Sequence, residues 1–246
     1  MMIPLSVELW IDGSSFLGAA VCMGFGAIGA AVGEGYAAGV ANAAVSRNPQ
    51  LAGPIFKTML VGQALAESAS IFALVVAMIL LFTYGAPHDS WLMGVGMLSS
   101  GICMGLGAVG SGIGSGFPAA EACAAVERQP AAANRFLTGM LVGSAVCQTP
   151  AIFSLVVSLL LVFSGFGGKP VHPTWAAVLG AGLCMGLGAI GPALGEGFAA
   201  GKAVKAMGRN PKEADVLTRT MLVGQAVTES TAIYSLVVAL LLLFVM

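Results

Sequence analysis

The amino-acid sequence predicts an all-α integral membrane protein, with six transmembrane helices arranged as three tandem hairpins that assemble into a ring. Of its 246 residues, 58% are hydrophobic and only 9% are charged, whereas a soluble domain carries about a quarter charged residues. Polar landmarks recur every 81 residues, as Arg47, Arg128 and Arg209 do. One structural unit is therefore written three times. The net charge of −1 gives no sign of nucleic-acid binding, so we expect no nucleic-acid partner.

Each unit holds two long apolar stretches around a short polar segment that contains a proline. Because proline disfavours helix in the residue before it, the chain is predicted to turn there. The predicted helices cover residues 14–46, 52–83, 91–127, 133–163, 174–208 and 214–245. At 1.5 Å per residue, about 32 residues span about 48 Å, which is enough to cross a bilayer. The three hairpins are placed at 1–86, 87–168 and 169–246.

Lysine and arginine predict the orientation of this multi-pass protein. Nine of the ten basic residues lie in or beside the hairpin loops, and only Lys169 lies in a linker between hairpins. Cytoplasmic loops carry the excess of basic residues. We therefore expect cytoplasmic loops and extracytoplasmic termini, with all three hairpins pointing the same way.

The first helix of each repeat contains a G-x-G-x-x-G pattern, which begins at Gly24, Gly105 and Gly186. A dinucleotide site needs this pattern between a strand and a helix, whereas these glycines lie inside apolar spans. In lipid, small residues let helix backbones approach closely. Three such small-residue faces, all parallel, predict a ring closed by several chains and surrounded by membrane lipid.

Two pairs of carboxylates lie in the middle of predicted spans: Glu34 with Glu67, and Glu196 with Glu229. A charged group at the centre of a bilayer is costly and marks a functional site. The members of each pair are 33 residues apart across the hairpin turn, so folding the hairpin brings them level. Each pair is predicted to share one site.

Oxygen-bearing side chains surround the carboxylates, and hard cations prefer oxygen ligands. They are Ser68, Ser230, Thr231 and Tyr234. Gln63 and Gln225 lie one turn before Glu67 and Glu229. These two glutamines are interpreted either as supporting partners of the site or as helix contacts. The middle repeat has Ser115 and Gln148 in place of its two carboxylates, which predicts an inactive site.

Three stretches resemble a known family: GAIGPALGEGFAAGKAV from Gly188, GRNP from Gly208 and MLVGQAVTESTAIYSLV from Met221. They are similar to the rotor-ring c subunit, or proteolipid, of F-type and A/V-type rotary ATPases. The resemblance covers nearly the whole chain as three fused hairpins. It implies a non-catalytic protein with no bound cofactor, in a ring of identical subunits that turns against the stator a subunit. Central-stalk subunits would contact the loops at Arg47, Arg128 and Arg209.

The resemblance also implies roles for individual residues. The ion-coupling carboxylates would be Glu67 and Glu229, with Glu34 and Glu196 as second carboxylate ligands. The remaining implied ligands are the hydroxyls of Ser68, Ser230 and Thr149 and the backbone carbonyls of Leu65, Val227 and Val146, supported by Thr231 and Tyr234. In the middle hairpin, Thr149 and Val146 would serve a neighbouring site.

The Glu-Ser pairs resemble those of sodium-binding members of the family, so Na⁺ is the favoured coupling ion and H⁺ the alternative. Two carboxylates around one Na⁺ would retain one proton, because like charges disfavour each other's ionised form. Two ions per chain favour an ATP-driven pump, and synthesis stays open. The competing interpretations are a self-contained channel or secondary transporter, and a purely structural membrane bundle.

Overall fold

The computed structural model describes residues 5–82, 90–166 and 171–245, and all regular elements within them are helical. The α-helices are α1 (Leu5–Arg47), α2 (Ala52–Phe82), α3 (Trp91–Arg128), α4 (Ala133–Val146), α5 (Thr149–Phe163), α6 (Val171–Arg209) and α7 (Ala214–Phe244). Six helical stretches are long and apolar enough to cross a membrane, with α4 and α5 together forming one of them. The predicted set of six membrane helices is confirmed.

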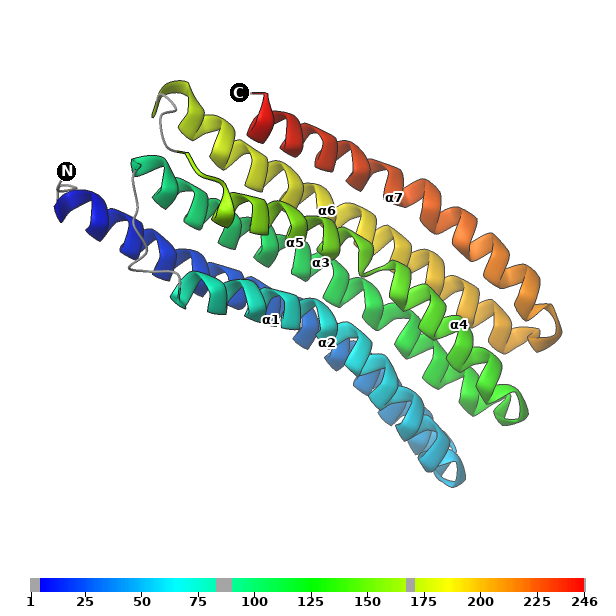
Figure 1. Cartoon of the computed structure of the whole chain (residues 1–246). Coiled ribbons are helices and arrows are strands. Elements are labelled where there is room, and N and C mark those ends of the chain that lie inside the picture. The colour runs from blue at the N-terminus through cyan, green and yellow to red at the C-terminus, as the bar shows by residue number, and fades with distance from the viewer. Residues whose placement is uncertain (1–4, 83–89, 167–170, 246) are drawn as a thin grey trace.

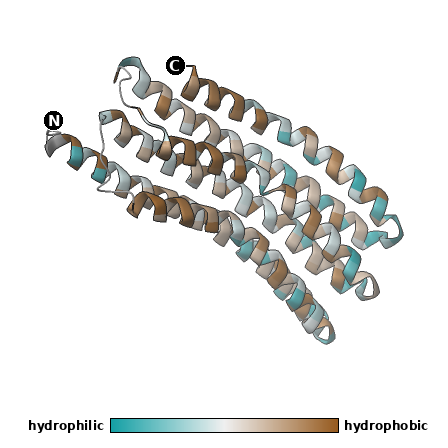
Figure 2. Ribbon diagram, in the orientation of Figure 1, coloured by the Kyte–Doolittle hydropathy of each residue, from teal (hydrophilic) through white to brown (hydrophobic). Residues whose placement is uncertain are grey.

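Each hairpin turns through a short 3₁₀ helix: η1 (Pro49–Leu51), η2 (Pro130–Ala132) and η3 (Pro211–Glu213). Proline opens all three, where its fixed φ is compatible with a helix start and its missing N–H is not needed. The turns gather at one end of the molecule and the two chain ends lie at the other (Figure 1). Hydrophilic residues are concentrated at the turns (Figure 2). The predicted hairpin boundaries, at 86/87 and 168/169, lie outside the described residues.

The first helix begins at Leu5, so the predicted start at residue 14 is wrong. Tertiary contacts hold the additional turns in place. The indole rings of Trp10 and Trp91 stack with centroids 4.8 Å apart, and Trp10 Nε1 donates a hydrogen bond to the Trp91 carbonyl at 3.1 Å. Ile11 is fully buried. Packing against α3 thus extends the helix through Asp12 and Gly13.

The prediction of one continuous helix over 133–163 is also wrong. The structure breaks it at Cys147 and Gln148, between α4 and α5. Pro150 explains the break, because it has no N–H to give to the carbonyl four residues earlier and its ring clashes with that carbonyl. The two matching helices, α2 and α7, run unbroken.

The helices form two rows. The first helices of the hairpins make one row, in which α3 packs between α1 and α6. The second helices lie on one side of that row (Figure 1): α2 contacts α1 and α3, while α4 and α5 contact α3 and α6. Each second helix therefore lies between its own first helix and the first helix of the following hairpin. Within the described chain, α7 has no first helix of a following hairpin to pack against.

Glycines set the spacing of the first row. A Cβ atom added at Gly112 would lie 2.5 Å from the carbonyl carbon of Gly29, and one added at Gly110 would lie 2.7 Å from the Cα of Ile190. Real Cβ atoms do not approach backbone this closely, so these positions require glycine. Close backbone approach is how membrane helices gain packing without a hydrophobic driving force. The predicted role of the repeated glycines as packing faces is confirmed at these contacts.

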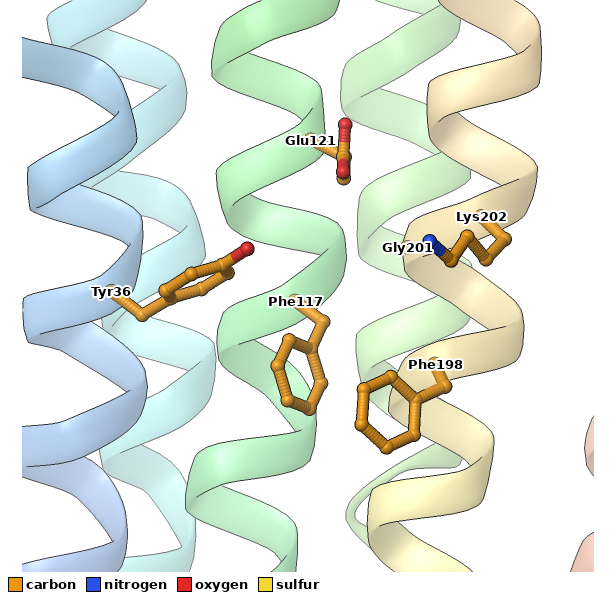
Figure 3. Close-up of a pocket in the computed structure, with 6 residues that line it drawn as sticks. All are labelled: Tyr36, Phe117, Glu121, Phe198, Gly201 and Lys202. Atoms are coloured by element: carbon orange, nitrogen blue, oxygen red, sulfur yellow. The ribbon is translucent and has the colours of Figure 1, made fainter. Parts of the chain in front are cut away.

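An aromatic row crosses the first helices on the side away from the second helices (Figure 3). The ring of Phe117 lies 5.5 Å from that of Tyr36 and 4.5 Å from that of Phe198. The three positions are spaced by 81 residues. Nearby, Lys205 Nζ donates to Glu121 Oε1 at 3.0 Å, so Glu121 belongs to an ion pair and does not replace the missing carboxylate at Ser115.

Candidate ion-binding sites

The third hairpin brings Glu196 of α6 and Glu229 of α7 close enough for their charges to repel. Glu196 is fully buried, with 0% exposure. Within the described part of the chain, neither of its carboxylate oxygens has a hydrogen-bond partner. A buried carboxylate without a donor is strongly destabilised unless a proton or a cation neutralises it. A proton or a cation at Glu196 would remove this cost.

The first hairpin repeats this pair with Glu34 of α1 and Glu67 of α2, which also lie within range of each other's charge. Here Glu34 is half-buried and Glu67 is exposed. The difference from Glu196 follows from the packing of the rows. The middle hairpin packs on α6 through α4 and α5, whereas within the described residues no helix covers the corresponding side of α1.

Hydroxyl and carbonyl oxygens lie together on α2 and α7, within one helical turn of Glu67 and Glu229 along the chain. The Ser68 hydroxyl donates to the Leu65 carbonyl at 2.7 Å, and the Ser230 hydroxyl donates to the Val227 carbonyl at 2.7 Å. Thr231, on α7, donates to its own helix. The Tyr234 side chain, also on α7, is largely exposed in the single chain.

Gln63 and Gln225 make helix contacts. Gln63 Nε2 donates to the backbone carbonyl of Glu34 at 3.3 Å, and Gln225 Nε2 donates to that of Glu196 at 3.2 Å. Gln225 also reaches across to the Gly143 carbonyl of the middle hairpin at 2.9 Å. Gln63 and Gln225 thus join the two helices of their hairpins at the backbone of Glu34 and Glu196.

The middle hairpin places an amide where the others have carboxylates. Gln148 Nε2 donates to Ser115 Oγ at 2.6 Å and to the Leu65 carbonyl of the first hairpin at 3.0 Å. The amide group therefore bridges two oxygens with its own N–H donors. Sequence spacing predicts the Gln148–Ser115 pairing, but it does not reveal the contact with Leu65, because that contact depends on how neighbouring hairpins pack.

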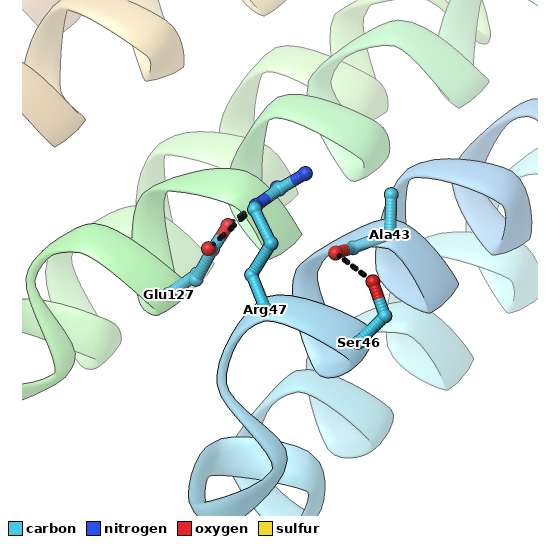
Figure 4. Close-up of polar contacts among 4 residues, drawn as sticks. All are labelled: Ala43, Ser46, Arg47 and Glu127. Carbon is cyan, nitrogen blue, oxygen red and sulfur yellow. Dashed lines mark hydrogen bonds and ion pairs between the residues drawn. The ribbon is translucent and has the colours of Figure 1, made fainter.

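At the hairpin turns, the Arg47 guanidinium binds Glu127 through two hydrogen bonds of 2.7 and 2.6 Å, next to the bond from the Ser46 hydroxyl to the Ala43 carbonyl (Figure 4). This two-pronged geometry joins the first and second hairpins. Arg128 and Arg209 are exposed. The three predicted loop arginines thus lie at the same end of the molecule, and one of them is held in an ion pair.

The family model for the c subunit of ATP synthase matches residues 17–80, 98–161 and 179–242, which is one match for each hairpin. The chain belongs to the ATP synthase c-subunit family. It is an integral membrane protein in which three hairpins of this family are fused, and c subunits are the non-catalytic proteolipids of the rotor. Membership implies assembly into a ring and association with other ATP synthase subunits.

Individual relatives match this protein over a length close to that of one hairpin. The ATP synthase c subunit of Alkaliphilus oremlandii is 55% identical over 69 residues, which is 28% of this chain and 77% of the relative. The ATP synthase c subunit of Petrotoga mobilis is 58% identical over 69 residues, 28% of this chain and 72% of the relative. The ATP synthase c subunit 2 of Cereibacter sphaeroides is 54% identical over 69 residues, 28% of this chain and 83% of the relative.

Proposed function

We propose that this rotor protein carries Na⁺ across the membrane at two sites per chain, one at Glu34 and Glu67 and one at Glu196 and Glu229. The observation that carries the proposal is the fully buried Glu196, which has no hydrogen-bond donor in the described chain and a second carboxylate beside it. Such a group must be neutralised, and a mid-membrane carboxylate is the usual mark of an ion path.

The oxygens around the carboxylates support Na⁺ over H⁺. A hard cation takes carboxylate, hydroxyl and carbonyl oxygens together, and the second helices present a hydroxyl and a carbonyl at the level of the carboxylates, as Ser230 and Val227 do on α7. Two ionised carboxylates with one Na⁺ would leave a net charge of about −1, which a bilayer disfavours. One retained proton makes the loaded site neutral. A ring that carries only protons is the alternative.

The middle hairpin fills a place in the ring without carrying an ion, because Gln148 supplies N–H donors of its own to Ser115 and Leu65. Each chain then moves two ions on six helices. Moving one charge across 100 mV takes about 2.3 kcal/mol. Fewer ions per turn leave more free energy from ATP for each ion, which favours an ATP-driven pump over synthesis.

The family supplies the remaining partners in this proposal. The ring turns against the stator a subunit, where each site releases its ion and is reloaded. The loops at Arg47, Arg128 and Arg209 face the central-stalk subunits in the cytoplasm, and the chain termini lie on the other side. The gathering of basic residues at the turns supports this orientation.

Carbodiimide labelling of the purified ring, across pH and with NaCl or KCl, tests the coupling ion. The reagent attacks a protonated buried carboxyl. We expect labelling at Glu67 and Glu229 that Na⁺ suppresses and K⁺ does not. Glu67→Gln should leave Glu229 as the labelled coupling residue. Labelling that follows pH and ignores Na⁺ would identify a proton rotor.

A further inference from the structure

The break between α4 and α5 lies at the level of the ion sites. Val146 is the last residue of α4, and its repeat equivalents are Leu65 and Val227. Pro150 has no N–H to donate to the Val146 carbonyl. The matching positions hold Ala69 and Thr231, and there the helices continue. The Val146 carbonyl therefore lacks a helical hydrogen bond that its two equivalents keep.

The contact made by Gln148 shows which way the carbonyl at this repeat position points. Leu65 lies on the first hairpin, yet its carbonyl accepts the Gln148 amide of the second hairpin. The carbonyl at this position thus faces the site of the following hairpin. By the repeat, the Val146 carbonyl faces Glu196 and Glu229.

Contacts made by the residue next to Val146 support this placement. The Cys147 thiol lies 3.8 Å from Gln225 Nε2 and within range of the charge of Glu196. The broken segment of the middle hairpin therefore lies against the third hairpin, next to the buried Glu196 carboxylate, which has no hydrogen-bond partner among the described residues. Freed backbone groups at membrane depth occur where they are covered by protein or line a cavity.

We propose that Pro150 makes the two ion sites of the chain unequal, by freeing the Val146 carbonyl as a stronger cation ligand for the site at Glu196 and Glu229. The residues assigned to this site, Glu196 and Glu229 of the third hairpin with Val146 and Thr149 of the middle one, all belong to one chain. The inference rests on the proposed cation-carrying function. It adds that the site at Glu229 holds Na⁺ more tightly than the site at Glu67.

The site at Glu67 depends on a second copy of the chain. By the same repeat, its carbonyl comes from Val227 of the partner subunit, where the helix continues and the carbonyl keeps its own hydrogen bond. The uncovered glycines at the two ends of the row of first helices are consistent with a contact between copies of the chain. Gly29 and Gly110 meet the following first helix, whereas a Cβ atom at their equivalent Gly191 would meet nothing within 4 Å in the described chain.

The complementary face lies on α1. Gly116 and Gly197 meet the backbone of the preceding first helix, but a Cβ atom at their equivalent Gly35 meets nothing within 4 Å in the part of the chain described. Two different surfaces, one at each end of the row, thus remain uncovered. A head-to-tail contact between copies covers both and repeats around a ring.

Pro150→Ala tests the proposal, because it gives the middle hairpin the residue that the first hairpin has at that position and restores an N–H for the Val146 carbonyl. The purified ring is labelled with carbodiimide over a series of NaCl concentrations at fixed pH. Peptide mass spectrometry then gives the half-protecting Na⁺ concentration separately at Glu229 and Glu67. Ile152→Ala, at an exposed position of the same helix, is the matched control.

In the unmodified ring, Glu229 is expected to be protected at lower Na⁺ than Glu67. Pro150→Ala should raise the concentration needed at Glu229 by roughly three- to tenfold, the effect of one ordinary hydrogen bond, and leave Glu67 unchanged. Equal shifts at both residues, or none, would overturn the proposal. If the variant does not assemble, Thr149→Ala should shift Glu229 alone, and Thr149→Ser should restore it.

Failure of the proposed sodium function has a different signature. Labelling of the unmodified ring would then ignore Na⁺ at both residues. The pH of half-labelling is then the quantity to compare. If Pro150→Ala changes this pH at Glu229 and not at Glu67, the two sites are unequal in a ring that carries protons. No change at Glu229 would reject the role of Pro150 for either ion.

Discussion

Gln148→Glu is expected to add an ion site to the two proposed for each chain and to lower the steepest ion gradient that the motor can build. The amide of Gln148 now satisfies Ser115 Oγ and the Leu65 carbonyl with its own N–H donors. A carboxylate has only acceptor oxygens, so all the groups around it would present oxygen. The new site would then need a proton or a cation to become neutral, as the sites at Glu67 and Glu229 do.

Two measurements check this prediction. The number of carbodiimide-reactive coupling residues per chain should rise from two to three. The free energy of ATP would then be divided among three ions where it was divided between two. The limiting free energy per ion should therefore fall by about a third. Proteoliposomes that pump to a static head give this limit directly.

Gln148→Met is the matched control, because it keeps the size of the side chain and adds no carboxylate. It should leave both the labelling count and the limiting gradient as they are. An assembled Gln148→Glu ring with two labelled residues and an unchanged gradient would show that the junction of the first two hairpins cannot hold an ion.

The sequence was sufficient for the architecture because a repeat of 81 residues carries its own internal evidence. A polar residue that recurs at the same spacing in all three repeats aligns the three hairpins with one another. The apolar composition then predicts that they lie in the membrane. The two errors in helix bounds have separate causes. Stacking of Trp10 on Trp91 is a tertiary effect, whereas the break at Cys147 could have been predicted from Pro150.

The candidate sites were predictable only within each hairpin. The 33-residue spacing brings Glu34 level with Glu67, because the turn between them is short. Contacts between hairpins, such as Gln148 to Leu65, depend on which first helix the second helix covers. That choice is made by side-chain and glycine packing across the row, and local sequence patterns do not record it.

Gly112→Ala is expected to prevent stable packing of the first two hairpins. The added methyl carbon would lie 2.5 Å from the carbonyl carbon of Gly29 and 2.6 Å from the backbone nitrogen of Ala30. Backbone cannot rotate away as a flexible side chain can, so α1 and α3 must move apart along their contact. Overpacking typically costs about 1–3 kcal/mol, and we expect a loss at the upper end of that range or beyond it.

Gly39→Ala provides the matched control for the same chemical change on the same row of helices. A Cβ atom at Gly39 meets nothing within 4 Å in the described chain, and the middle hairpin already carries Ala120 at the equivalent position. The readouts are the fraction of ring that survives in SDS and the midpoint of thermal dissociation. Gly39→Ala should match the unmodified ring in both.

The two variants together separate packing from ion binding. Because the Leu65 carbonyl reaches Gln148 only when α2 lies against α3, moving α1 and α3 apart should also loosen the junction between the first two hairpins. Glu196 and Glu229 belong to the third hairpin, so protection of Glu229 should persist in whatever ring remains. A Gly112→Ala ring as stable as the Gly39→Ala ring would mean that the close approach at Gly29 does not set the helix spacing.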